Sequence, residues 1–185
     1  MSPGTATRLD FVEQYVAAAE RFAVAVASTP MDAAVPTCPG WSAYDLVCHL
    51  GNVHAWAATI VETCRQAAEQ NDEPRSRKPK VVSEWYAGKA EDLYEVLRTA
   101  DPEAPCWNFA FGAGFAGFWP RRQTHETTIH TVDLLGCTGG TVQIDAEVAA
   151  DGIDEVLTVF LPRMNDRGYP TDLTAPLCLV ATDVR

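Results

Sequence analysis

The stretch PRRQTHETTIHTVDLLGC, residues 120–137, predicts both a helix of the fold and the residues that carry its chemistry. Pro120 suits the first turn of a helix, and Gly136 is of the type that commonly ends one. Apolar residues recur at helical spacing over residues 9–27, 42–68 and 83–100 as well, and a fifth such stretch covers residues 145–164. We therefore expect four long helices and one more at the C-terminal side.

These elements predict an all-α fold, a bundle of four antiparallel helices with an extra C-terminal helix. Ser42 and Ser83 are the expected N-caps of the second and third helices, and Asp45 lies in the first turn of the second. The segment PCWNFAFGAGFAGFWP, residues 105–120, is too rich in glycine for a helix and too long for a tight turn. We expect it to be a loop, and its residues 108–118 to line or cover a pocket.

The helical part should form one domain over residues 1–165, followed by a tail over residues 166–185. The end of this tail, APLCLVATDVR, is β-prone, yet a single strand has no partner here. We interpret the tail as the start of another domain.

Composition excludes several classes of protein. A net charge of −11 argues against nucleic acid as a partner, and the one basic run, RSRKPK at residues 75–80, is expected to be a solvated linker. No signal peptide precedes the first helix and no stretch approaches the ~20 apolar residues of a membrane span, which predicts a cytoplasmic protein with no membrane contact. The six cysteines form no C-x-x-C pair, so neither a zinc ribbon nor a disulfide scaffold is expected.

The motif His125-Glu126-x-x-x-His130 differs from the zinc protease signature H-E-x-x-H by one residue. At about 100° per residue, His125 and His130 diverge by about 140°, whereas Glu126 and His130 lie only about 40° apart. Glu126 and His130 therefore form the pair that shares one face of the helix, and His125 is a bystander.

A metal site needs a further ligand, and His49 is the best candidate because it lies among apolar residues of the second helix. His54, five residues later, should point away from His49, and Cys48 and Cys137 are expected to be buried structural thiols. A set of two histidines and one glutamate suits zinc and leaves an open coordination position. The residues alone leave an alternative open, in which His49 and His130 are core side chains with no metal.

Two charged residues lie on nearly the same face as Glu126. Asp133, seven residues later, is a candidate to orient a metal ligand through a hydrogen bond. Arg122, four residues earlier, is a candidate to contact an anionic substrate, and a simple i,i+4 salt bridge with Glu126 is an equal alternative.

The motifs CPGWSAYDLVCHLGNVHAW, residues 38–56, and FWPRRQTHETTIHTVD, residues 118–133, resemble those of the mycothiol-dependent maleylpyruvate isomerase family. The similarity covers residues 9–163. It implies a DinB-like four-helix bundle that binds a divalent metal, with zinc the expected ion, through His49, Glu126 and His130. It also implies a smaller C-terminal α/β domain, of which residues 166–185 are a truncated start unless that domain is absent.

The resemblance also implies an activity. The cofactor would be mycothiol, whose thiolate adds to the maleyl double bond of the substrate, so that rotation and elimination give the trans isomer. Other members are expected to use the thiol for transfer reactions. The expected partners are therefore a small-molecule thiol and a small electrophilic or anionic substrate, bound by a monomer or homodimer. The alternative is a non-catalytic module that binds metal or thiol.

Overall fold

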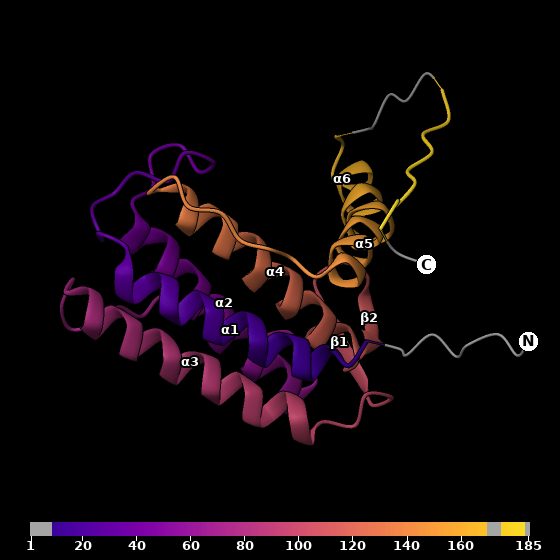
Figure 1. The fold of residues 1–185 in the computed structure, drawn as a ribbon. Helices are drawn as coiled ribbons and strands as arrows, with labels where there is room; N and C mark the ends of the chain where they lie inside the picture. Colours follow the sequence, from indigo (N-terminus) through magenta and orange to yellow (C-terminus); the bar gives the residue numbers. More distant parts are fainter. Residues whose placement is uncertain (1–8, 170–174, 184–185) are drawn as a thin grey trace, which may run out of the picture.

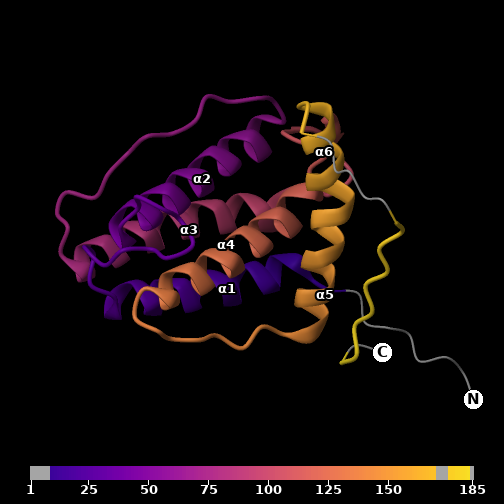
Figure 2. The same ribbon diagram turned by 90° about the horizontal axis from the view of Figure 1, so that it is seen from above.

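The computed structural model describes residues 9–169 and 175–183. Four long helices form a bundle, and a shorter helical segment runs across one end of it, beside a small hairpin (Figures 1 and 2). The elements in chain order are α1 (Phe11–Ser28), α2 (Ala43–Thr63), α3 (Pro79–Thr99), β1 (Pro105–Asn108), β2 (Gly112–Phe115), α4 (Phe118–Gly136), α5 (Ala146–Glu155), η1 (Val156–Phe160) and α6 (Leu161–Asp166). The predicted helical bundle is confirmed.

The core fills the space between the four long helices. Each helix places its apolar stripe inward, as its 3.6-residue periodicity requires. The large side chains that are fully buried there come from every bundle helix and include Tyr15, Phe22, Leu46, Leu50, Ile60, Tyr86, Leu93, Trp119 and Leu134. Burial of this many large side chains is the main stabilisation of the fold.

The N-cap prediction is right for α2 and wrong for α3. Ser42 caps α2, and its backbone N–H and hydroxyl both contact the Asp45 carboxylate, at 2.9 and 2.7 Å, in a capping box. The helix α3 instead begins four residues before Ser83, because Pro79 is already compatible with a first turn. Ser83 therefore lies inside α3, where its hydroxyl donates to the carbonyl of Ala23 at 3.0 Å.

The four helices are not all antiparallel to their neighbours, which corrects the sequence prediction. Residues 51 and 54 of α2 meet residues 85 and 86 of α3 in the same order along the chain, so α2 and α3 run in the same direction. Residues 64–78 connect the end of α2 to the start of α3 by running back along the length of the bundle (Figure 2). At about 3.3 Å per residue this segment is long enough to span a helix of about 30 Å. It is thus a long crossover rather than a short turn.

The aromatic and glycine-rich segment is a β-hairpin, not the loop expected from its composition. Strands β1 and β2 pair antiparallel, with Asn108 opposite Gly112. The Asn108 side chain accepts hydrogen bonds from the N–H groups of Ala110 and Phe111, at 3.0 and 2.9 Å, and Gly112 has φ +73°. Side-chain bonding by asparagine and a glycine with positive φ are the features that make this tight connection possible.

The fifth predicted helix is continuous but contains a π-helical turn, η1, in which the Leu161 N–H bonds to the carbonyl of Val156. Pro162 follows directly and has no N–H to offer, so regular α-helical bonding is interrupted at this place. In the β-prone tail, residues 175–183 contain no strand, and residues 184 and 185 lie outside the described residues. None of the helices described is long and apolar enough to cross a membrane.

Candidate metal centre

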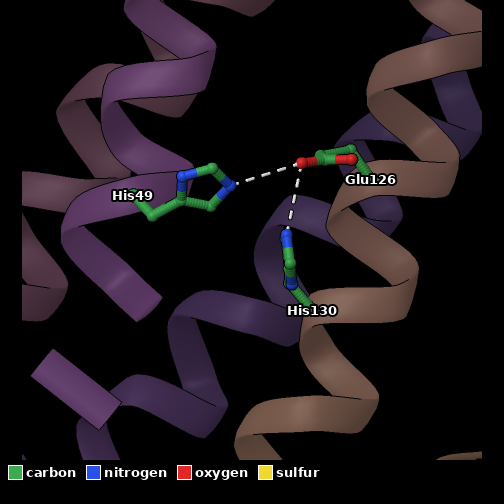
Figure 3. Close-up of side chains that lie close together, drawn as sticks. All are labelled: His49, Glu126 and His130. Atoms are coloured by element: carbon green, nitrogen blue, oxygen red, sulfur yellow. Dashed lines mark hydrogen bonds and ion pairs between the residues drawn. The ribbon is translucent and has the colours of Figure 1, made fainter. Parts of the chain in front are cut away.

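Three side chains from two helices converge between α2 and α4 (Figure 3). His49 comes from α2, and Glu126 and His130 come from successive turns of α4. Their potential ligand atoms all lie within 4.8 Å of one another. Since α2 and α4 run antiparallel, residues about eighty positions apart in the chain meet here, and the three candidates selected from spacing are brought together.

The distances within the cluster fit a metal ion. Glu126 Oε1 lies 3.2 Å from His130 Nε2 and 3.6 Å from His49 Nε2. Ligand atoms bound tetrahedrally to zinc at about 2.0–2.1 Å are separated by about 3.3 Å, so an ion could bind with small adjustments. The His49 side chain is 37% exposed, compared with 14% for His130, so the cluster opens on the α2 side.

His130 is held in one orientation by a chain of hydrogen bonds. Its Nδ1 lies 2.9 Å from Asp133 Oδ2, and the hydroxyl of Thr37 donates to Asp133 Oδ1 at 2.6 Å. With a proton on Nδ1 directed at Asp133, Nε2 is the nitrogen that faces Glu126, and it could bind a metal once it has lost its own proton. Burial works against protonation of His130, yet the Glu126 and Asp133 carboxylates outweigh it and raise the pKa of His130.

Glu126 is ionised because its neighbours compensate for its burial. Burial alone would raise its pKa, but hydrogen bonds from His130 and His49 and the charge of Arg122 hold the pKa of Glu126 well below the usual range. Arg122 Nη2 donates to Glu126 Oε2 at 2.6 Å, which leaves Oε1 for the two histidines.

The i,i+4 salt bridge that the sequence allowed for Arg122 is formed, but it is buried rather than exposed. Arg122 is only 6% exposed and also pairs with Glu155 of α5, which is 2% exposed. Burial raises the pKa of Glu155 to about 7, against the opposing charge of Arg122. Two carboxylates therefore share the single charge of Arg122 and tie α4 to α5.

The remaining histidines lie outside the cluster, as predicted. His54 is fully buried, with its ring nitrogens 2.9 Å from Gln123 Oε1 and 3.1 Å from the Tyr86 hydroxyl, and burial lowers its pKa to about 4. His125 Nε2 contacts Asp151 on α5 at 2.7 Å. Both side chains have structural partners, so neither is available to the candidate metal.

Cys48 and Cys137 are half-buried rather than fully buried as expected. Burial raises the pKa of Cys48 to about 11 and also raises the pKa of Cys137. Both groups are therefore thiols at neutral pH and are poor metal ligands.

Two cavities adjoin the cluster. One of about 410 Å³ lies on the His49 side and includes Trp41, whose ring is 5.1 Å from that of His49. The other, of about 680 Å³, reaches Glu126, and Phe109 is the one residue of the range 108–118 that lines it, so the prediction for this segment is confirmed only for Phe109. This cavity is also lined by Arg163 and Arg167, which sequence reasoning missed. Their i,i+4 spacing at the end of the last helix was the available signal.

Comparison with known proteins identifies a family that matches most of the chain. A family described as "Mycothiol maleylpyruvate isomerase N-terminal domain" matches residues 12–135, a range that contains His49, Glu126 and His130. The curated proteins contain no match to this chain, and neither do the solved structures.

Proposed function

Because the chain belongs to the mycothiol maleylpyruvate isomerase N-terminal domain family, we propose that it is a metal-binding, mycothiol-dependent enzyme, an isomerase or a thiol transferase. His49, Glu126 and His130 are the proposed ligands of one divalent ion, with zinc the expected metal. The observation that carries the proposal is the convergence of these three side chains, with their potential ligand atoms within 4.8 Å of one another.

The donor set supports a catalytic rather than a purely structural metal. Structural zinc sites are usually closed by four protein ligands, whereas catalytic sites use three and keep one position open. Within the described residues, no fourth His, Cys, Asp or Glu joins the group of three. A divalent ion held there would lower the pKa of a bound thiol and so favour the nucleophilic thiolate.

The surrounding residues orient the candidate ligands, and two cavities lie beside them. Asp133 fixes the His130 ring, and Arg122 holds the Glu126 carboxylate so that Oε1 faces both histidines. The two adjoining cavities, of about 410 and 680 Å³, share Val53, Trp56 and Glu69 as lining residues. Together they provide room for a thiol cofactor on one side and a small electrophile on the other.

Elemental analysis of the purified protein, combined with a thermal shift against mycothiol, tests the proposal. We expect about one equivalent of divalent metal in the wild type. We expect much less in His130→Ala and an unchanged amount in the matched control His125→Gln, because His125 contacts Asp151 rather than the cluster. Equal metal content in wild type and His130→Ala would refute the metal site.

Turnover separates catalysis from simple binding. The metal-loaded protein should convert maleylpyruvate, or transfer the thiol to another electrophile, only when mycothiol is present. A protein that binds metal and mycothiol but turns over neither kind of substrate would be the non-catalytic module instead.

A further inference from the structure

Two cysteines, Cys64 and Cys106, meet where the end of α2 lies beside the hairpin. Cys64 is the C-terminal cap residue of α2, and Cys106 is the second residue of β1. The N–H of Trp107 donates to the carbonyl of Cys64 at 3.2 Å, so the backbone that follows Cys106 lies directly against that of Cys64. Two cysteines that are far apart in the chain are therefore neighbours in the fold.

The side chains of this pair converge as well. Cys64 Sγ donates to the carbonyl of Val61 at 3.6 Å, and Cys106 Sγ donates to the carbonyl of Ile60 at 3.7 Å. These two carbonyls belong to successive residues in the last turn of α2. Burial, and after it the interaction with the Cys64 side chain, raise the pKa of Cys106 to about 11. Both thiols thus lie at one place, and a disulfide requires just such a close approach of two cysteines.

The backbone of Cys64 is unusual for a cysteine. Its φ is 56° and its ψ is 20°, which is the left-handed conformation, and within the described residues it is the only non-glycine residue with a positive φ. Glycine, and sometimes asparagine, ordinarily takes this conformation at the end of a helix. A cysteine here is therefore more strained than a glycine would be, and the group that it adds is the thiol.

The two thiols differ in access to solvent. Cys64 is half-buried, whereas Cys106 is only 3% exposed. A small reagent therefore reaches Cys64 first, and Cys106 is placed to react with a modified Cys64. An accessible cysteine beside a second, resolving cysteine is the usual arrangement of a redox-sensitive pair. Because Cys106 is a protonated thiol at neutral pH, its reaction is expected to be the slower step.

We propose that Cys64 and Cys106 form a disulfide by exchange with a low-molecular-weight disulfide, so that the pair is a site of reversible oxidative modification. The Cys64 thiolate attacks one sulfur of the small disulfide, which gives a mixed disulfide and releases one small thiolate; this thiolate takes up the proton that Cys64 lost. Cys106 then loses its proton, attacks Cys64 Sγ and releases the second small thiol. Two protein thiols are thereby oxidised by two electrons, and the small disulfide is reduced to two thiols.

The disulfide would join β1 covalently to the end of α2. Trp107, the residue after Cys106, lines the cavity of about 680 Å³, and its carbonyl accepts a hydrogen bond from Trp119 Nε1 at 3.1 Å. Oxidation would therefore fix one wall of this cavity. Neither cysteine belongs to the candidate metal cluster, so the inference goes beyond the proposed function and does not depend on it.

Equilibration of the full-length, metal-free protein with reduced and oxidised glutathione tests the inference. The remaining thiols are alkylated, and the disulfides are mapped by mass spectrometry of peptides. In the native protein we expect a Cys64–Cys106 disulfide whose equilibrium constant against glutathione is about 30- to 1,000-fold higher than in the urea-unfolded chain, because a disulfide forms more readily in the folded state by the factor by which it stabilises that state.

Single variants test the order of the two steps. Cys106→Ala should stop at a mixed disulfide of glutathione on Cys64, and Cys64→Ser should leave Cys106 reduced, because Cys106 is buried. Cys178→Ser, which removes an exposed cysteine, is the matched control and should keep the Cys64–Cys106 disulfide.

Equal equilibrium constants in the native and unfolded chains would overturn the inference. So would a mixed disulfide on Cys64 that persists at equilibrium in the wild type, or a native disulfide between other cysteines, such as Cys38 and Cys137, with Cys64 and Cys106 still reduced. The mapping of the wild type decides if Cys106→Ala fails to fold.

Discussion

Replacing Asp133 with asparagine tests whether His130 acts as an oriented metal ligand. Asp133 does not belong to the group of three, but its Oδ2 lies 2.9 Å from His130 Nδ1. Asparagine keeps the size of the side chain and an oxygen acceptor, and it removes the negative charge. The His130 ring then loses the carboxylate that fixes its protonated nitrogen and makes the opposite nitrogen a better ligand.

The expected magnitude follows from this single contact. Loss of a hydrogen-bonding partner behind a metal ligand typically lowers metal affinity by about 10- to 100-fold. Each factor of ten corresponds to about 1.4 kcal/mol, so the stabilisation of the folded state by excess zinc should fall by about 1.4–2.8 kcal/mol. Thr37→Val should give a smaller decrease, because Thr37 contacts Asp133 Oδ1 rather than His130 itself.

Two measurements check the prediction: competition for zinc against a chromophoric chelator, and urea unfolding with and without zinc. Because Thr37 acts through Asp133, the double variant Asp133→Asn/Thr37→Val should bind zinc no more weakly than Asp133→Asn alone. Wild-type zinc affinity in Asp133→Asn would refute the reasoning that Asp133 orients a ligand. Additive losses in the double variant would show that Thr37 acts by another route.

Three further predictions concern stability. The pKa of His54 is about 4 in the folded state and about 6.5 when exposed, so the unfolded chain binds a proton first as pH falls. The unfolding free energy of the metal-free wild type should therefore fall by roughly 3 kcal/mol between pH 7 and 4 because of this group. Urea titrations at several pH values should show that His54→Gln lacks this pH-dependent component. Arg122→Met should lower the free energy of unfolding by about 3 kcal/mol, because it leaves Glu155 buried and unpaired. The double variant Arg122→Met/Glu155→Gln should recover part of this loss in the same assay, and no recovery would contradict the buried pairing. In Gly51→Ala the new methyl group would lie 2.3 Å from the Trp85 ring, so a decrease of about 1–3 kcal/mol is expected on chemical denaturation, and wild-type stability would show that α2 and α3 can separate freely.

The helices were predictable because their apolar periodicity is local, but their directions depend on the length of a connection. The basic run at residues 75–80 was expected to be a linker, and residues 75–78 do belong to the connection, but α2 ends at Thr63 rather than near residue 68 and α3 already begins at Pro79. Nothing in the composition of the connection shows whether it turns back or crosses the bundle. The start of α3 depended similarly on a competition between Pro79 and Ser83. The hairpin was missed because alternation is weak in strands of only four residues, and two of the four residues of β2 are glycine.

The cluster of three was predictable because two of its members lie one turn apart on one helix. His49 followed from its position on an apolar helix face, and the antiparallel arrangement of α2 and α4 brings it to Glu126. The burial of Arg122 was not predictable, since it depends on Glu155 from a helix whose position no local pattern encodes. The same holds for Arg163, which meets Phe109 only through the tertiary fold.

Which side chains of the last helical segment face the cavity is decided by the number of residues in the π-helical turn η1, not by the identity of those residues. An α-helix advances about 100° per residue, and a π-helical turn accommodates one extra residue, so α6 is rotated by about that angle relative to an uninterrupted continuation of α5. Phe160 at the end of the turn and Arg163 beyond it line the same cavity. Deletion of one residue from η1 would turn Arg163 of α6, and Arg167 just after it, away from the cavity without changing either of them. A one-residue difference in length at this place would therefore change which side chains line the cavity.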